Sequence, residues 1–217
     1  LTLSNGAAIE HIFGTDFDDT IVGNNRLNLI LGQNGNDTLT AVSESVVGDV
    51  VFGDGFDLDI PNLGEVINGL INLSIPVGVF RATGSGRDTL KGSDGIDFLV
   101  GGDGNDSLDG EGGADLLFGD GFNSSLNVDS GLSLETVLKL AEPSSLLSKV
   151  WDLFALHIGF ELVQAGEDTI KAGDGADVVF GGDLNDTIVS GGGAADILFG
   201  NGGNDNISST SEFTVAV

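Results

Sequence analysis

Aspartates recur at nine-residue steps along most of this chain, and they are its clearest candidates for chemistry. From Gly14 onward each unit follows the pattern GGxGxDxUx, in which U is a large aliphatic residue. Thirteen units place at their sixth position Asp19, Asn28, Asp37, Asp49, Asp88, Asp97, Asp106, Asp115, Asp168, Asp177, Asp186, Asp196 and Asp205. A short carboxylate beside turn glycines suits a hard divalent cation such as Ca²⁺, which takes six to eight oxygen ligands. We therefore predict that the twelve aspartates are calcium ligands.

The elements that position these carboxylates follow from a second regularity. Two residues after each sixth position stands a large aliphatic residue: Ile21, Ile30, Leu39, Val51, Leu90, Leu99, Leu108, Leu117, Ile170, Val179, Ile188, Leu198 and Ile207. Glycine-rich linkers lack such phased aliphatic residues, so a low-complexity linker is excluded. A repeat of this kind indicates stacked structural units that bury one continuous core.

This pattern resembles the repeats-in-toxin (RTX) family of secreted bacterial proteins over residues 14–55, 83–121 and 163–208. The resemblance implies a mainly β fold, a right-handed parallel β-roll (β-solenoid) that binds calcium. In that family the first six residues of a unit turn around the ion and the last three form a strand. Two units then make one coil of eighteen residues, and aspartates eighteen apart face each other across an ion.

Carboxylates on neighbouring coils, about 4.8 Å apart, repel each other unless a divalent ion lies between them. Alternating the units between two edges gives ten pairs: 19–37, 88–106, 168–186, 186–205, 97–115 and 177–196, and, if the roll continues through its interruptions, 37–88, 49–97, 106–168 and 115–177. Up to about ten ions would reduce the net charge of −27 to about −7, an ordinary surface charge. Asn28, Leu184 and the extra residue within 191–195 weaken individual sites.

Two segments, 56–82 and 122–162, interrupt the repeat within what we expect to be a single domain over residues 1–217. Each follows a Phe-Gly-Asp-Gly-Phe string, at 52–56 and 118–122. Helical spacing predicts a short helix from Asn62 to about Ile71, an extended stretch over 73–79, and helices over 134–141 and 143–157.

One sheet of the roll is expected to have an apolar outer face. The neighbours of the U residue are all apolar in even-numbered units, whereas in odd-numbered units only Val22 and Val189 are. An uncovered apolar ladder of this size would aggregate. We therefore predict that the interruptions fold back over this sheet, with association to another chain as the competing interpretation.

Composition excludes several classes of function. The seven basic residues are scattered, which argues against nucleic acid and anionic membranes as partners. The chain has no cysteine, and no apolar run is long enough for membrane insertion. We see no Sec-type signal, and a chain that starts at Leu1 is expected to be a fragment or a processed form.

Catalytic interpretations are weak. Asp16, Asp18 and Asp19 lie close together as in a paired-carboxylate hydrolase, but they occupy a turn of the repeat. His11 and His157 fall in no zinc-type spacing and near no nucleophile motif. We predict no catalytic residue and no enzymatic activity.

The favoured function is a non-enzymatic calcium-binding structural module of a secreted or cell-surface bacterial protein. The first alternative is a self-assembling filament, sheath or surface-layer subunit, because the end coils expose strand edges. The second is the carboxy-terminal calcium domain of a secreted hydrolase or adhesin, since residues 212–217 look like the acidic-then-apolar tail of type I secreted relatives. Expected partners are calcium ions and, in the alternatives, other copies of the chain or domains of a longer chain.

Overall fold

The computed structural model describes residues 1–2, 11–42, 47–59, 79–125, 159–163, 165–193, 195–211 and 213–216. Every regular element within these ranges is a β-strand. The strands are β1 (His11–Phe13), β2 (Thr20–Val22), β3 (Leu29–Gln33), β4 (Thr38–Thr40), β5 (Val47–Asp59), β6 (Val79–Thr83), β7 (Thr89–Lys91), β8 (Ile96–Gly102), β9 (Ser107–Asp109), β10 (Gly112–Gly113), β11 (Leu116–Ser125), β12 (Gly159–Val163), β13 (Thr169–Lys171), β14 (Asp174–Gly175), β15 (Val178–Gly182), β16 (Thr187–Val189), β17 (Ala195–Asn201), β18 (Asn206–Ser208) and β19 (Phe213–Ala216).

The chain divides into two compact units. The first holds Leu1–Gly55, Ala82–Gly121 and Leu162–Val217, and the second holds Phe56–Arg81 and Phe122–Glu161. The first unit contains the nonapeptide repeats, and the second contains most of the two interruptions. The expectation that all 217 residues form a single domain stays a prediction.

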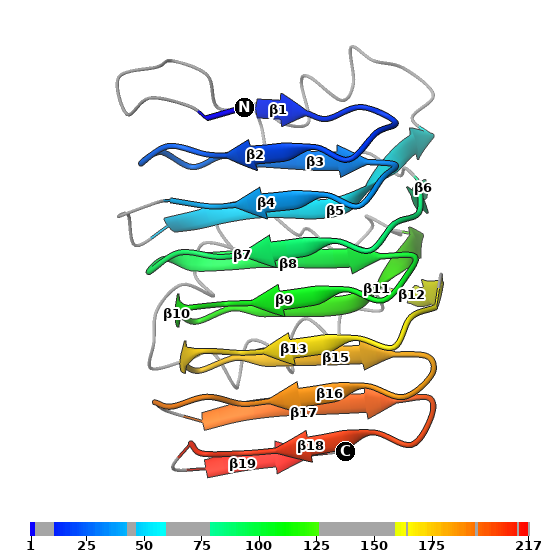
Figure 1. Ribbon diagram of the computed structural model, residues 1–217. Helices are drawn as coiled ribbons and strands as arrows, with labels where there is room; N and C mark the ends of the chain where they lie inside the picture. Colours follow the sequence, from blue (N-terminus) through cyan, green and yellow to red (C-terminus); the bar gives the residue numbers. More distant parts are fainter. Residues whose placement is uncertain are drawn as a thin grey trace. The chain divides into compact units, whose positions relative to one another are not determined.

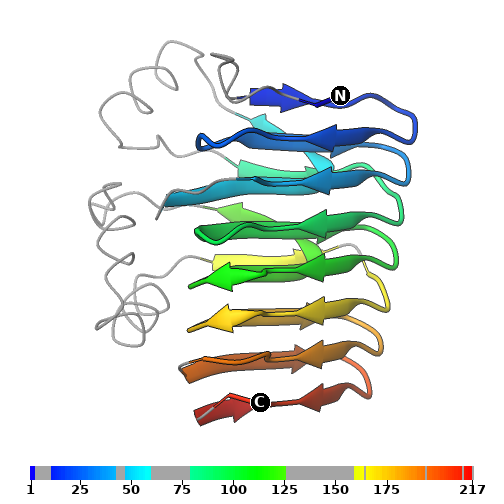
Figure 2. The ribbon, with the colours of Figure 1, turned by 60° about the vertical axis from the view of Figure 1, so that its left-hand side comes forward.

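The repeat-bearing unit is a parallel β-roll, as predicted. One sheet stacks β2, β4, β7, β9, β13, β16 and β18 in parallel, and the facing sheet stacks β1, β3, β5, β8, β11, β15, β17 and β19. Figure 1 shows the chain alternating between the two sheets, and Figure 2 shows each coil lying directly on the next.

The roll continues in register through both interruptions. Leu39 of β4 pairs with Leu90 of β7 across the first, and Leu108 of β9 pairs with Ile170 of β13 across the second. The stacking partner therefore lies 51 or 62 residues ahead at these points instead of 18. Turn residues separated by an interruption are thus brought onto neighbouring coils.

The core of the roll is a ladder of the aliphatic U residues. Twelve of the thirteen are at most 2% exposed, from Ile21 to Leu198, and Ile207 in the last coil is partly buried against them. Each short strand of the first sheet except β18 buries only this central residue and exposes the residue before it. The nine-residue period is thus the distance between successive core positions.

The outer faces of the two sheets differ as the sequence predicts. On the second sheet, the residues beside the core position are buried or half-buried, and Phe52, Phe118 and Phe180 are only 6–7% exposed. Five phenylalanine rings, of Phe52, Phe98, Phe118, Phe180 and Phe199, follow one another with centroid separations of 5.8, 5.8, 4.8 and 4.8 Å. The interrupting segments predicted to cover this face lie outside the described residues, so the covering stays a prediction.

The strands β5 and β11 run past the Phe-Gly-Asp-Gly-Phe strings to Asp59 and Ser125. Beyond its string, β11 pairs antiparallel with β6, through Ser124 and Phe80. The predicted helices near 62–71, 134–141 and 143–157 fall outside the described residues. Among the described residues, we find no helix of the length and apolarity that a membrane span requires.

One turn residue has a backbone conformation that its side chain disfavours. Leu184 stands at the fourth position of its unit, where the pattern GGxGxDxUx has its third glycine. Its φ is +74°, and the residue is 49% exposed. A left-handed non-glycine residue costs roughly 1–2 kcal/mol, whereas glycine accepts this conformation freely.

We predict that Leu184→Gly raises the free energy of unfolding of the calcium-loaded chain by up to about 1 kcal/mol. The strain relieved is partly offset by the greater freedom of glycine in the unfolded chain. Leu184→Ala is the control, because it removes the exposed side chain and keeps the strained φ. Denaturant unfolding measures both variants, and an equal gain for alanine and glycine would contradict the backbone explanation.

Candidate calcium-binding edges

The turns of the roll form two stacked edges. Turns that lead into the first sheet form edge 1, which holds Asp19, Asp37, Asp88, Asp106, Asp168, Asp186 and Asp205. Turns that lead into the second sheet form edge 2, which holds Asn28, Asp49, Asp97, Asp115, Asp177 and Asp196. Both interruptions lie in edge 1 turns, between Gly53 and Asp88 and between Gly119 and Asp168.

On each edge the sixth-position side chains form a continuous hydrogen-bonded ladder. Oδ1 of each aspartate accepts the N–H of the sixth residue in the preceding coil. On edge 1 the donor–acceptor distances are 2.7 Å for Asp19 to Asp37, 2.7 Å for Asp37 to Asp88, 2.8 Å for Asp88 to Asp106, 2.8 Å for Asp106 to Asp168, 2.9 Å for Asp168 to Asp186 and 3.1 Å for Asp186 to Asp205.

Edge 2 repeats the arrangement. The distances are 2.6 Å for Asn28 to Asp49, 2.8 Å for Asp97 to Asp115, 2.9 Å for Asp115 to Asp177 and 3.1 Å for Asp177 to Asp196, and the N–H of Asp49 donates to Asp97. The structure thus brings all twelve predicted aspartates into two ladders and makes neighbours of the ten predicted pairs.

The second carboxylate oxygen is left without a donor in most of these residues. Oδ2 is buried and has no hydrogen-bond partner in Asp37, Asp88, Asp106, Asp115, Asp168, Asp177, Asp186 and Asp196. These eight side chains are at most 3% exposed. A buried carboxylate costs several kcal/mol unless an opposite charge compensates it.

The free oxygens face main-chain carbonyls and not donors. A Cβ built on Gly32 would overlap both Oδ2 of Asp37 and the carbonyl oxygen of Gly53, and Gly101 has the same relation to Asp106 and Gly119. At Gly32 and Gly101 the first turn position requires glycine, because these oxygens lie so close to the Cα. Each turn therefore gathers carboxylate and carbonyl oxygens around one small space.

This donor set fits calcium. Ca²⁺ accepts carboxylate and carbonyl oxygens together in flexible geometry, and it supplies the positive charge that the buried oxygens lack. Among the described residues, no three acidic or histidine side chains converge closely enough to hold an ion by themselves. Main-chain carbonyl oxygens must therefore complete the coordination shell.

Burial changes the acidity of the ladder residues. Desolvation, with a smaller contribution from neighbouring carboxylates, raises the pKa of Asp88 and Asp177 to about 7, of Asp106 and Asp168 to about 8, and of Asp115 to about 9. It raises the pKa of Asp186 to about 6, and it also raises the pKa of Asp37, Asp97 and Asp196. Near neutral pH and without a cation, Asp106, Asp168 and Asp115 resist ionisation.

In three turns a backbone N–H of the same turn donates to the sixth-position side chain, which was not predicted from the sequence. The N–H of Thr15 donates to Oδ2 of Asp19 at 2.7 Å, the N–H of Ser93 donates to Oδ2 of Asp97 at 2.6 Å, and Asn24 holds Asn28 in the same way at 2.7 Å. Other turns have at this second position either glycine, as at Gly102, Gly173 and Gly182, or a polar residue with a positive φ, as at Gln33, Glu111 and Asn201. A polar second residue therefore does not by itself identify turns of this kind from the sequence.

The structure also places two buried aspartates at edge 1 that the sequence analysis did not select. Asp54 and Asp120 are the central residues of the two Phe-Gly-Asp-Gly-Phe strings and are 3% and 0% exposed. The repetition of the string was their only signal. By contrast, Asp16 and Asp18, which were weighed as catalytic carboxylates, are exposed turn residues that accept hydrogen bonds from Asn34 and Asn36.

A parallel β-roll whose stacked turns present unmatched carboxylate oxygens defines a class of calcium-dependent solenoid. The family model of the RTX calcium-binding nonapeptide repeat matches residues 13–41, 83–117, 91–126, 164–188 and 188–211. These matches cover more than half of the 217 residues, so the chain belongs to this family. No curated protein matches the chain.

The raised pKa values predict how the calcium-depleted roll responds to pH. Above the ordinary value of 3.8 the unfolded chain loses these protons, whereas folded Asp106 and Asp168 keep theirs until about pH 8. The folded state then binds more protons, so the free energy of unfolding falls as pH rises, by about 1.4 kcal/mol per pH unit for each such carboxyl.

We therefore expect the calcium-depleted chain to lose β-structure as the pH rises from 5 to 8. Far-ultraviolet circular dichroism in calcium-stripped buffer measures this loss, and the same titration in saturating calcium is the control and should stay flat. A calcium-depleted chain that gains β-structure as the pH rises would contradict the assigned pKa directions.

Proposed function

We propose that this chain is a non-enzymatic, calcium-dependent structural module of a secreted or cell-surface bacterial protein, which folds when it meets extracellular calcium. The observation that supports this most is the set of eight buried sixth-position carboxylates with one oxygen each lacking a donor. No ordinary core would retain so many uncompensated acids. Calcium bound between successive coils compensates them.

The proposed ligands are Asp19, Asp37, Asp49, Asp88, Asp97, Asp106, Asp115, Asp168, Asp177, Asp186, Asp196 and Asp205, together with main-chain carbonyl oxygens. Turns whose second residue does not donate to the sixth-position carboxylate leave Oδ2 without a donor, as at Asp37, Asp106 and Asp115, and are the stronger sites. Asp19 and Asp97 contribute less, because Thr15 and Ser93 already engage their second oxygen.

In this proposal calcium makes folding depend on whether the chain is inside or outside the cell. An ion that binds the folded roll and not the unfolded chain stabilises the roll by mass action. Without bound ions, repulsion within a chain of net charge −27 opposes compaction and favours an expanded state. Because the ion-free chain stays expanded, it is exported unfolded. It then folds in millimolar external calcium, as in the secreted proteins that the repeat resembles.

Two alternatives share this calcium chemistry and differ in what the module does. Stacking through the terminal strands β1 and β19 would make it a filament or surface-layer subunit, and exposed Phe13 of β1, at 62%, favours an end contact. A calcium domain of a secreted hydrolase or adhesin would stay monomeric. The mass of calcium-loaded particles by light scattering separates the two, because only the first grows with concentration.

Removing calcium tests the proposed function. We expect chelation at pH 8 to abolish most of the far-ultraviolet β-signal and to expand the radius of gyration from roughly 17 Å, for a compact chain of this length, toward roughly 50 Å. Restored calcium should reverse the change, whereas magnesium should not, because it demands near-ideal octahedral geometry. A compact, β-structured chain in chelator at pH 8 would contradict the proposal.

Position along edge 1 predicts how much each ligand matters. Asp106 has a coil on each side, while Asp205 belongs to the last coil of the edge and is more exposed. If each weakened site loses 10–100-fold in affinity, it costs roughly 1.4–2.7 kcal/mol. Asp106→Asn should therefore destabilise the calcium-loaded chain about twice as much as Asp205→Asn. Unfolding in denaturant at fixed calcium measures this, and equal losses would count against ions shared between coils.

A further inference from the structure

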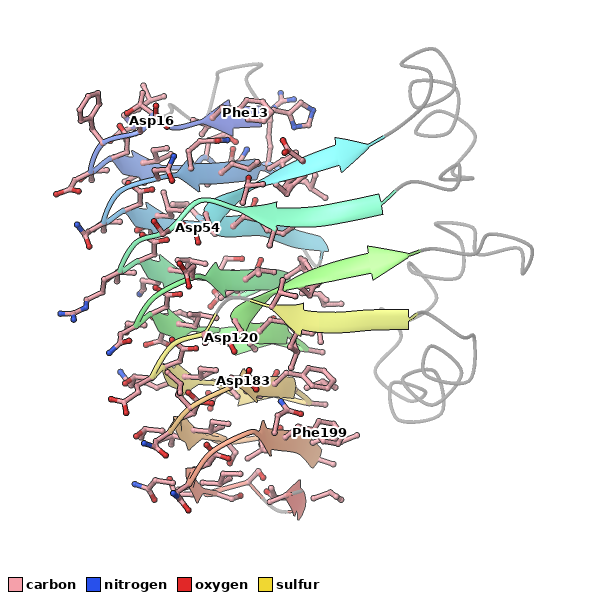
Figure 3. All side chains as sticks on the ribbon, turned by 90° about the vertical axis from the view of Figure 1, so that its right-hand side faces the viewer. Phe13, Asp16, Asp54, Asp120, Asp183 and Phe199 are labelled. Atoms are coloured by element: carbon pink, nitrogen blue, oxygen red, sulfur yellow. The ribbon has the colours of Figure 1, made fainter. Side chains whose placement is uncertain are left out.

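The two turns from which the chain leaves the roll each hold an aspartate outside the nonapeptide pattern. Asp54 and Asp120 occupy the second turn position, and the same position one coil further on is glycine, Gly102 or Gly182. Figure 3 shows the two aspartates at different levels of the same edge. In the other turns of edge 1 the chain continues from this position around the turn. At Asp54 and Asp120 the chain instead leaves the roll into an interruption, and the aspartate carboxylate stays in the turn.

The Asp54 carboxylate has an oxygen with no donor. Its Oδ2 accepts the N–H of Asp103 at 2.6 Å, but its Oδ1 has no hydrogen-bond partner although the residue is only 3% exposed. Oδ1 borders the space beside Gly84, and so does the carbonyl oxygen of Gln33. Gly84 has a φ of +104° and no side chain, so this space stays open between the two oxygens.

The surroundings of Asp54 add negative charge. The carboxylates that act on it are those of Asp88, Asp106 and Asp103. Among the described residues, the ion pairs join Lys91 to Glu111 and Lys171 to Asp109, and no cationic side chain contacts Asp54. A carboxylate buried among other carboxylates needs a cation to be stable in its ionised form.

Asp120 occupies the corresponding place at the second interruption and shares the Oδ2 contact of Asp54, but its Oδ1 has a donor. Its Oδ2 accepts the N–H of Asp183 at 2.5 Å, as Oδ2 of Asp54 accepts that of Asp103. Its Oδ1 accepts the N–H of Gly166 at 2.9 Å, and each carboxylate oxygen retains a second lone pair for a metal. Gly182 must lack a Cβ, because one would overlap the Asp120 carboxylate.

We propose that Asp54 and Asp120 are calcium ligands of the two interrupted turns, a second kind of ligand beside the sixth-position aspartates. The proposal rests on the proposed calcium-dependent function. The carboxylate supplies a charged oxygen in the turn where the chain leaves the roll. Main-chain carbonyl oxygens, such as that of Gln33, complete the coordination shell of the ion. Each interruption is thereby anchored to the roll by an ion at its base.

The most direct test is a crystal structure of the unaltered chain grown in calcium. We expect an ion, identified by its anomalous signal, within about 2.3–2.6 Å of a carboxylate oxygen of Asp54 and another at the same distance from Asp120. Ions between other coils with none on Asp54 or Asp120 would overturn this inference alone. A calcium-grown crystal with no ion on either edge would overturn the proposed function as well.

A pair of variants gives an independent measure in solution. Asp54→Asn keeps an acceptor for the N–H of Asp103 and removes the charge, while Asp94→Asn removes the same charge from an exposed turn residue on edge 2. We expect Asp54→Asn to bind about one calcium ion fewer per chain, or to bind one at least about tenfold more weakly. Asp94→Asn should keep the full count.

Equilibrium dialysis with elemental analysis counts the ions, and calorimetry gives the affinities. A full count and affinities within about twofold of the unaltered chain would show that Asp54 serves only as a hydrogen-bond acceptor. If Asp54→Asn does not fold in saturating calcium, the crystal structure of the unaltered chain decides, because it requires no substitution.

Discussion

Buried carboxylates that keep one oxygen without a donor are the constraint on which the rest of this structure depends. Most sixth-position aspartates use Oδ1 to hold the amide of the preceding coil and turn Oδ2 into a space lined by carbonyl oxygens, as Asp106 does. The first oxygen fixes the stacking distance, and the second requires a cation. A single side chain thus joins neighbouring coils and makes their stacking dependent on calcium.

Other features follow from the need to keep these oxygens close together. Glycine at the first turn position lets carboxylate and carbonyl approach one Cα, as Gly32 does beside Asp37. Three-residue strands bury one aliphatic side chain each, so the core alone is a narrow ladder. A roll with so thin a core and so many acidic residues has little stability without ions. Ion binding supplies the free energy of folding that hydrophobic burial alone does not provide.

Much of this arrangement could be predicted from the sequence, because the nine-residue period holds within most of each repeat block and every unit has a large aliphatic residue two positions after its sixth residue. The core residues, the two ladders and the difference between the sheets follow from counting positions. The continuation of the roll across 51 and 62 residues could not be derived, since the phase of a repeat is lost in an irregular segment. Thr15, Ser93 and Asp54 were missed for another reason: their importance lies in which neighbouring amide they contact, which only the packed turns determine.

The central claim is that ions bridging successive coils hold the roll together, and native mass spectrometry during a calcium titration tests it most directly. If neighbouring sites share ligands, ions should bind cooperatively, so that chains with no ion and chains with many, up to about ten, coexist with few intermediates. The compact charge-state distribution should belong only to the loaded chains. Stepwise filling of independent sites on a chain that is compact from the start would contradict the account.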